Sequence, residues 1–351
     1  MTQIRRSLNL HAPLRRTPHH VLRTLLAHLP EDTTAEEPVR RLEERVATLL
    51  GKQAALLFPT GTMAQQVALR IHAETTGRHT FAAHPQSHLA VHEANGYSVV
   101  HGLRLHPLGD PNRLFTAEDL DGVAEPLAAL LVELPQRDIG GQVPSWEELE
   151  AHTRWAKDGG ARAHLDGARL WEAQTAYDKT HAEIAALFDT VYVSLYKGLE
   201  GTAGAVLAGD EATIAHARVW RQRLGGSMPD AWPMAAIALV GLEETLPRMA
   251  EFRDHAQALA RAINAGTPAH TVPEVPCTPL FHVHVPAPRH EVEEAARKLL
   301  EREGIQLFHR TRSNPDPRRC SFEVVVGVNA VDFTPDEVAA LIGLLAIRSP
   351  V

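Results

Sequence analysis

Cysteine, lysine and long apolar runs are all scarce in this chain. Its two cysteines, Cys277 and Cys320, are too few for a disulfide framework and are typical of a reducing cytosol. No apolar run approaches the roughly 20 residues that cross a bilayer, and the basic N-terminus has no apolar segment of the kind that signal peptides carry. We therefore expect a cytoplasmic protein without a membrane partner.

Positive charge is outweighed by negative charge. The chain has 35 basic and 43 acidic residues, a net charge of −8 at pH 7. This balance argues against a general binder of nucleic acid or anionic lipid. The 351 residues, 44% of them hydrophobic, are enough for a large core and for two lobes of a globular protein.

Lysine is rare even among the basic residues. A chain that uses arginine for most of its positive charge has few lysines, and the presence of each calls for a chemical explanation. The five lysines are Lys52, Lys157, Lys179, Lys197 and Lys298.

Short apolar runs alternate with amphipathic segments, which is typical of an α/β protein with a mainly parallel sheet. Buried strands are expected at residues 54–58, 128–134, 161–165, 190–194 and 203–208. Helices are expected at residues 38–50, 63–73, 145–159, 210–223 and 230–265, the third opened by a capping box at Ser145–Glu148.

The pattern changes near Gly266. Strands at 281–285, 305–309 and 322–328 and a helix at 290–303 follow, and Thr334–Glu337 is a second capping box before a last helix. We expect an N-terminal arm over residues 1–30, a large domain over 31–265 and a small C-terminal α/β domain over 266–351.

Three motifs carry candidate chemistry. The first is Pro59-Thr-Gly-Thr-Met63, a small-residue turn between a strand and a helix. Free backbone N–H groups and the positive end of the helix dipole make such a turn an anion site. A plain βα turn with no ligand has the same composition, so this motif alone does not decide.

The second motif places Asp166 where a strand ends, in His164-Leu-Asp-Gly-Ala-Arg169. Ligands bind at this edge of parallel sheets, and a carboxylate there can pair with a protonated pyridine nitrogen. Two alternatives stay open: Asp166 caps the following helix, or His164 and Asp166 belong to an iron site with a second histidine.

The third motif places Lys197 after an apolar strand and before two glycines, in Val191-Tyr-Val-Ser-Leu-Tyr-Lys-Gly-Leu-Glu-Gly201. Burial lowers the pKa of an amine and favours the neutral form that attacks a carbonyl. A surface lysine at a strand end is the alternative.

With these motifs in this order, the sequence resembles the threonine aldolase and β-eliminating lyase branch of pyridoxal-5′-phosphate (PLP) enzymes. The resemblance covers roughly residues 35–260 and is carried by the segments 50–63, 164–170, 194–199 and 219–228. It implies an aspartate-aminotransferase-like fold, with a mostly parallel seven-stranded sheet in the large domain. It also implies a homodimer or homotetramer with active sites at the interface.

The resemblance also assigns site residues. Lys197 would form the Schiff base with PLP, Asp166 would pair with the pyridine nitrogen, and Gly61 and Thr62 would bind the phosphate. His88 would stack on the ring, and Arg169 would lie near the ring's 3-hydroxyl or the substrate carboxylate. His88 and His92 are four residues apart, which makes zinc a formal alternative; we expect no metal and a structural role for His92.

Several positions depart from the family. A histidine proposed as an acid/base residue is replaced near Gln136, and tyrosine at 196 stands where serine usually precedes the lysine. A lysine that reaches the neighbouring subunit's phosphate falls near Gln222, which leaves Arg221 or Arg223 to substitute. The arginine expected to bind the substrate carboxylate falls within residues 322–328, which contain none.

The function that we expect is a PLP-dependent lyase that cleaves the Cα–Cβ bond of a β-hydroxy-α-amino acid to glycine and an aldehyde. His88 or a bound water is the candidate base for the β-hydroxyl. The alternatives are a β-eliminating lyase, in which Lys197 removes the α-proton, and a PLP-binding protein without turnover.

Overall fold

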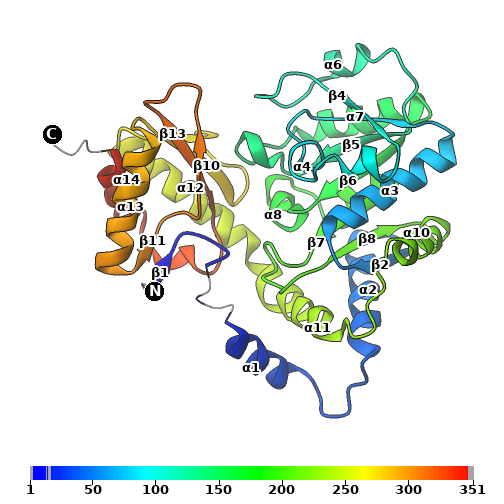
Figure 1. Cartoon of the computed structure of the whole chain (residues 1–351), viewed down its shortest axis with the longest axis horizontal. Helices are drawn as coiled ribbons and strands as arrows, with labels where there is room; N and C mark the ends of the chain where they lie inside the picture. Colours follow the sequence, from blue (N-terminus) through cyan, green and yellow to red (C-terminus); the bar gives the residue numbers. More distant parts are fainter. Residues whose placement is uncertain (1–2, 13, 15–16, 347–351) are drawn as a thin grey trace. The chain divides into compact units, whose positions relative to one another are not determined.

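The computed structural model describes residues 3–12, 14 and 17–346. They form two compact units (Figure 1). The large unit consists of residues 23–139 and 143–246, and the small unit of residues 1–22, 140–142 and 247–351. The predicted domain boundaries at 30 and 265 stay predictions.

The large unit is built on a seven-stranded sheet with the order β2-β8-β7-β6-β5-β3-β4. Its strands are β2 (Ala54–Phe58), β3 (Thr80–Ala83), β4 (Arg104–Pro107), β5 (Ala129–Glu133), β6 (Arg162–Gly167), β7 (Thr190–Ser194) and β8 (Ala205–Gly209). The five neighbouring strands β7, β6, β5, β3 and β4 are parallel to one another. Strand β8 is antiparallel to both of its neighbours, β7 and β2. The predicted mostly parallel seven-stranded sheet is therefore confirmed.

All five predicted strands of this sheet are present, whereas β3 and β4 were not predicted. β4 lies at the edge of the sheet and is exposed or half-buried throughout, so its sequence carries no apolar run. On the other side of β7, β8 is reversed, and β2, which leads into the candidate anion turn, runs in the same direction as β7.

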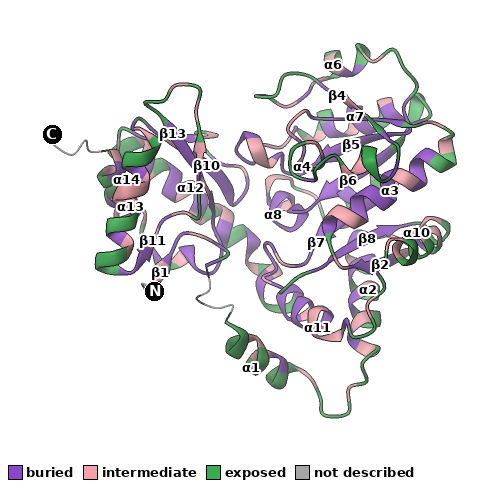
Figure 2. Ribbon diagram, viewed as in Figure 1, coloured by how far each residue is buried: buried purple, intermediate pink, exposed green. Residues whose placement is uncertain are grey.

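Helices cover the sheet, and the longest buried one is α3 (Gly61–Thr76), ten residues of which are buried. Its apolar side chains pack with those of β2, β7 and β8 in one core cluster, and Figure 2 shows buried residues along α3 and along these strands. The large unit also contains the helices α2 (Glu37–Leu50), α4 (His88–Val91), α5 (Gly96–Val99), α6 (Ala117–Asp121), α7 (Trp146–Asp158), α8 (Leu170–Ala173), α9 (His181–Ala186), α10 (Glu211–Arg223) and α11 (Trp232–Val240). Helix α1 (Pro18–His28) precedes them.

The helix predicted over 230–265 is wrong as a single element. α11 is followed by a π-helical turn over Gly241–Thr245, a 3-10 turn over Leu246–Arg248 and then α12 (Met249–Gly266). Pro247 cannot donate a helical hydrogen bond, which interrupts the α pattern there. Gly241 lies so close to the backbone of Leu199 that no side chain fits.

The small unit contains an antiparallel four-stranded sheet with the order β12-β13-β10-β9. Its strands are β9 (His270–Val272), β10 (Leu280–Val285), β12 (Thr311–Ser313) and β13 (Cys320–Val325), and its helices are α12, α13 (Arg289–Glu303) and α14 (Pro335–Ala346). A second, parallel pair joins β1 (Arg6–Ser7) to β11 (Ile305–Gln306), which is shorter than the predicted strand at 305–309.

The two predicted capping boxes differ in outcome. The first forms as predicted: the Ser145 hydroxyl accepts from the N–H of Glu148 at 3.2 Å, and the Glu148 carboxylate accepts from the N–H of Ser145 at 2.8 Å. Thr334 accepts from the N–H of Glu337 at 3.3 Å, but the Glu337 carboxylate pairs with Arg6 of the N-terminal segment.

Across the part of the chain that the structure describes, no helix is both long and apolar enough to cross a membrane.

Candidate active site

The carboxyl ends of β5, β6 and β7 bring the main candidate residues to one edge of the large sheet. Glu133 on β5 pairs in register with Asp166 on β6, and Asp166 pairs with Tyr192 on β7. Lys197 follows the end of β7 by three residues. Parallel strands with adjacent carboxyl ends thus place an amine beside two carboxyl groups.

Lys197 is buried, with 8% of its surface exposed. Burial and, after it, the charge of Arg169 lower the pKa of its amine to about 8, while the charges of Asp166 and Glu133 oppose the shift. With this pKa, about a tenth of the amine is in the neutral, nucleophilic form at pH 7, far more than for an exposed lysine. The alternative of a surface lysine is wrong.

Asp166 is completely buried and offers one oxygen to a ligand. Its Oδ1 accepts from the N–H of Ala168 at 3.0 Å, whereas Oδ2 has no hydrogen-bond partner among the described residues. Burial raises the pKa of this carboxyl group, and the charges of Lys197 and His88 lower it. A buried acceptor without a partner is costly, and a protonated pyridine nitrogen would satisfy it.

The first alternative for the Asp166 motif, a cap of the following helix, is wrong. Helix α8 begins at Leu170 and is preceded by Arg169, so Asp166 is not its N-cap. The Nδ1 of His164 lies 2.8 Å from the hydroxyl of Thr190. No group of three potential metal ligands exists among residues 3–12, 14 and 17–346. The described residues therefore supply no complete ligand set for iron at His164 and Asp166 or for zinc at His88 and His92.

The predicted anion turn opens α3. Thr60 is the N-cap, and its hydroxyl accepts from the N–H of Met63 at 3.2 Å. Gly61 and Thr62 hold the first two helical positions, where backbone N–H groups point out of the helix along its dipole. A methyl group on Gly61 would overlap the phenolic hydroxyl of Tyr192, so only glycine fits there.

Arg169 is buried at the start of α8, close enough to Lys197 to lower its pKa. Glu172, one helical turn later, is also buried. Its carboxyl group packs against Gly198, where a Cβ atom would lie 2.6 Å from the carboxyl carbon. The glycine after Lys197 therefore lets this buried acid approach the lysine's backbone.

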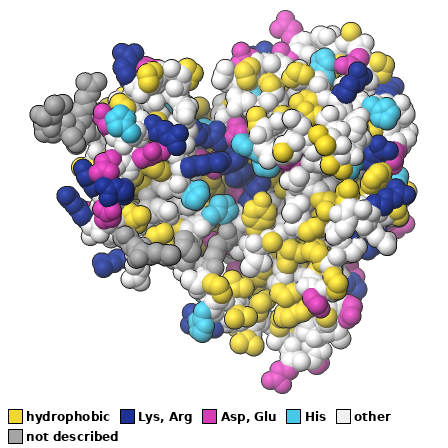
Figure 3. Space-filling model, in the orientation of Figure 1, with side chains coloured by type: hydrophobic (Ala, Val, Ile, Leu, Met, Phe, Trp, Pro, Cys, Tyr) yellow, Lys and Arg dark blue, Asp and Glu magenta, His cyan; other side chains and the backbone are white. Residues whose placement is uncertain are grey.

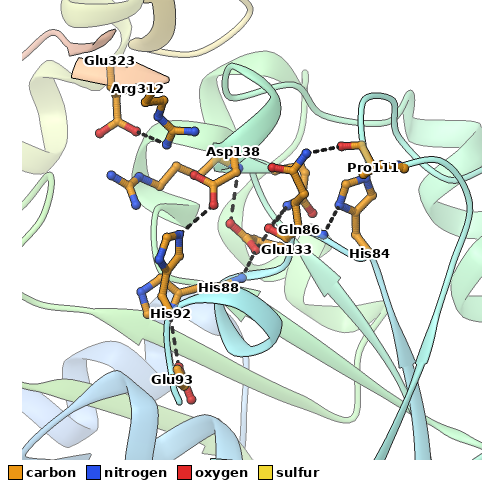
Figure 4. A network of polar contacts seen from close by, with 12 residues as sticks. His84, Gln86, His88, His92, Glu93, Pro111, Glu133, Asp138, Arg312 and Glu323 are labelled. Atoms are coloured by element: carbon orange, nitrogen blue, oxygen red, sulfur yellow. Dashed lines mark hydrogen bonds and ion pairs between the residues drawn. The ribbon is translucent and has the colours of Figure 1, made fainter. Parts of the chain in front are cut away.

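Two histidine–carboxylate pairs lie beside this edge of the sheet (Figure 4). His88 Nδ1 lies 3.1 Å from Glu93 Oε1, and His92 Nε2 lies 2.7 Å from Asp138 Oδ2. The two imidazole rings are in contact, with centroids 5.1 Å apart. His92 lies immediately after α4 rather than on it, because this helix ends at Val91.

Glu133 and Asp138 are site residues that the sequence analysis missed. Glu133 accepts from the N–H of His88 at 2.9 Å and from that of Arg137 at 3.2 Å, which fixes both loops. Burial and the charge of Asp166 raise the pKa of Glu133 to about 8. Its position as the last residue of a buried strand is the same signal that identified Asp166.

Arg221 and Arg223 make contacts within their own unit. A guanidinium nitrogen of Arg221 donates to the carbonyl of Leu57 at 2.5 Å, and Arg223 stacks on Trp220 at 4.9 Å. Among the described residues, the hydrogen bond and ring contact of these two arginines are thus with Leu57 and Trp220, not with Gly61 or Thr62. Their role at a neighbouring subunit's phosphate stays a prediction.

Comparison with known proteins agrees with this geometry. The family model of the β-eliminating lyases matches residues 27–282. The chain belongs to the β-eliminating lyase family. A low-specificity L-threonine aldolase of Arabidopsis thaliana is 28% identical over 320 residues, which are 87% of this chain and 88% of the relative.

Two solved structures are more similar in sequence. A candidate L-allo-threonine aldolase from Listeria monocytogenes EGD-E is 36% identical with a TM-score of 0.90, covering 98% of this chain and 96% of its own. A candidate aromatic amino acid β-eliminating lyase/threonine aldolase from Exiguobacterium has the same identity and TM-score, and the coverages are 98% and 97%. The protein is thus a PLP-dependent lyase of the aldolase and β-elimination type with the predicted fold.

Proposed function

We propose that this lyase cleaves the Cα–Cβ bond of β-hydroxy-α-amino acids to give glycine and an aldehyde. The observation that carries the proposal is the buried Lys197 amine beside Asp166, whose Oδ2 lacks a partner among the described residues. This pair fits a pyridine aldehyde cofactor. The names of the relatives, threonine aldolases among them, support this bond as the one that breaks.

The residues of this chain divide the work of holding the cofactor. Lys197 would attach PLP covalently, and Asp166 would keep a proton on the pyridine nitrogen. The backbone N–H groups of Gly61 and Thr62 would bind the phosphate, and His88 would cover the ring. When bound, PLP supplies an electron sink for the substrate's Cα.

Arg169 acts on the Lys197 amine through its charge. Its guanidinium disfavours a proton on the Lys197 amine, since the lysine pKa falls in the presence of this charge. We assign Arg169 to the 3-hydroxyl of the ring or to the substrate carboxylate. Arg221 and Arg223 are candidates for the phosphate of a neighbouring subunit.

In the aldol reaction, a base takes the proton of the β-hydroxyl group. The oxygen's electron pair forms the aldehyde double bond as the Cα–Cβ bond breaks, and the electron pair left at Cα takes up a proton to give glycine. No oxidant is needed, because every electron pair stays in the products.

β-Elimination is the second candidate reaction, and the match to the family model of the β-eliminating lyases favours it. In that reaction Lys197 removes the α-proton, a β-substituent leaves with its electron pair, and hydrolysis gives an oxoacid and ammonia. Incubation with threonine, phenylserine and β-substituted serine analogues separates the two reactions. Glycine plus aldehyde supports the proposal, and oxoacid plus ammonia contradicts it.

The cofactor assignment has its own test. We expect borohydride to fix PLP to Lys197 in the wild type, giving a mass increase on the peptide that contains it. Lys197→Ala should lose the label, while Lys298→Ala, a change on the exposed face of α13, should keep it. A wild type that acquires no reducible adduct when PLP is supplied would overturn the assignment.

We further propose a cytoplasmic homodimer or homotetramer whose active sites lie at the interface. Apolar side chains on the large unit support a partner surface: Val91, Val99, Val100 and Val219 are 44–81% exposed. Figure 3 shows hydrophobic side chains gathered on the visible face of this unit. Light scattering at several concentrations would measure the mass, and a monomer would contradict the proposal.

A further inference from the structure

The aldol reaction needs a base for the β-hydroxyl proton, and the family's histidine for this task is absent near Gln136. The same segment supplies Asp138 two residues later, and this carboxylate is bonded to His92 (Figure 4). We propose that His92, oriented by Asp138, is the acid/base residue that takes the proton of the substrate's β-hydroxyl group. This inference rests on the aldol function proposed above.

The fold brings the pair together from two parallel strands. His92 follows β3 and α4, and Asp138 lies in the 3-10 turn Arg137–Ile139 that follows β5, the neighbour of β3 in the sheet. The Asp138 carboxylate is buried, with 7% of the side chain exposed, whereas 33% of His92 is exposed. The imidazole is thus held from the protein side and open on the other.

The hydrogen bond decides which nitrogen can act as the base. An ionised carboxylate only accepts, so the proton of the neutral ring lies on Nε2, 2.7 Å from Asp138 Oδ2. Nδ1 then carries the lone pair and can receive a proton. The carboxylate also stabilises the imidazolium that forms, which is the function of the aspartate in histidine–aspartate pairs of hydrolases.

The charge of the His92–Asp138 pair is linked to that of Lys197 through Glu133. The charge of Asp138 contributes to the raised pKa of Glu133, and Glu133 in turn raises the pKa of Lys197. His88, whose ring contacts that of His92, lowers the pKa of Asp166. A proton held on His92 therefore lies beside His88, the residue assigned to the cofactor ring.

His88 is less suited to this step. Its backbone N–H is bonded to Glu133 and its Nδ1 faces the buried carboxyl group of Glu93. Glu93 is itself bonded by Gln66 at 2.9 Å. His88 is thus fixed on two sides, as a residue that covers the cofactor ring requires, and the proposal gives the proton transfer to His92.

The proposed step balances without a further reactant. His92 Nδ1 takes the β-hydroxyl proton, the oxygen's electron pair becomes the aldehyde π bond, and the Cα–Cβ bond pair remains on Cα. In the synthetic direction, the imidazolium returns the same proton to the new β-hydroxyl oxygen.

The variants His92→Asn and Asp138→Asn test the pair, with His106→Asn as the matched control. His106 is 31% exposed and its Nδ1 lies 3.2 Å from Glu125, so it is a comparable histidine–carboxylate pair away from the site. We expect His92→Asn to lower kcat for threonine and phenylserine by about 10²- to 10⁴-fold with little change in KM. Asp138→Asn should lower it less, and His106→Asn should leave it unchanged.

Two further measurements separate catalysis from structure. Exchange of the glycine α-proton with deuterated water needs PLP and Lys197 but no β-hydroxyl base, so it should persist in His92→Asn. In the apoprotein, ¹⁵N NMR of the histidines should show His92 protonated at Nε2 in the wild type, and Asp138→Asn should lose this preference.

Each outcome decides between the assignments. Cleavage that persists in His92→Asn overturns the role of His92 and leaves the aldolase function in place. Loss of glycine exchange together with cleavage shows that His92 only maintains the fold of the site, which also overturns it. A wild type that exchanges glycine but cleaves no β-hydroxy amino acid overturns the aldol function itself and the base with it.

Discussion

The phenolic hydroxyl of Tyr192 lies directly against the Cα of Gly61, so a methyl group on Gly61 would overlap it. Gly61 is the first residue of α3, and Tyr192 lies on β7 beside Asp166. The start of the predicted phosphate-binding helix is therefore set by packing against the strand that leads to Lys197. The glycine is needed for this close approach rather than for an unusual backbone angle.

We expect Gly61→Ala to weaken PLP binding and to destabilise the fold by roughly 1–3 kcal/mol, since overpacking forces the helix or the tyrosine to move. PLP titration and urea unfolding measure the two effects. Gly343→Ala is the control, because its Cβ would meet no atom within 4 Å in α14. Unchanged PLP affinity in Gly61→Ala would contradict the role given to this contact.

The sequence was sufficient to predict five of the seven strands of the large sheet and to single out candidate residues that the fold brings to one edge of it. Lys197, Asp166 and the turn at Gly61 each lie next to a buried apolar strand, and local patterns of that kind are readable in one dimension. β4 was missed because an exposed edge strand has no apolar run to identify it.

The remaining site residues depend on which strands become neighbours. Glu133 matters because β5 lies beside β6 in register, and Asp138 matters because its loop meets the one after β3. Spacing along the chain does not contain that information: His92 and Asp138 are 46 residues apart. The sequence alone therefore indicates only a structural role for His92, because it does not show this contact.

The lowered pKa of Lys197 can be measured directly on the apoprotein. With a pKa of about 8, Lys197 should show half-maximal labelling by trace acetic anhydride near pH 8, with the exposed Lys298 as internal reference. Asp166 raises this pKa, so Asp166→Asn should move the midpoint to lower pH. Peptide mass spectrometry gives both curves.

The control for this shift is Asp316→Asn, an acidic residue that pairs with Arg318 in the small unit. It should leave the Lys197 midpoint in place. A midpoint that moves to higher pH in Asp166→Asn would show that the carboxyl group does not act on the amine through its charge.

Gly198 and Glu172 should show strong coupling. A methyl group at Gly198 would lie 2.6 Å from the carboxyl carbon of Glu172, so Gly198→Ala should destabilise the protein and displace Lys197. Glu172→Ala removes the obstructing atoms, and the double variant should be more stable than the sum of the two single changes predicts, by about 0.5–3 kcal/mol. Urea unfolding of the four proteins completes the cycle, and strict additivity would contradict the contact.

The buried pair His72 and His164 should make the fold sensitive to acid. Both rings bond to the hydroxyl of Thr190, at 2.7 and 2.8 Å, and burial lowers the pKa of His72 to about 4 and that of His164 to about 3. In the unfolded chain both take up protons near pH 6.5. The unfolded state therefore binds more protons than the folded state as the pH falls below 6.5, and stability is lost with a slope of up to about 1.4 kcal/mol per pH unit for each histidine.

We expect His164→Leu to be less stable at pH 7, because Thr190 loses a partner, yet to lose less stability between pH 6.5 and pH 4. Urea unfolding at half-unit pH steps measures both, and equal slopes in the two proteins would show that His164 already carries a proton in the folded state.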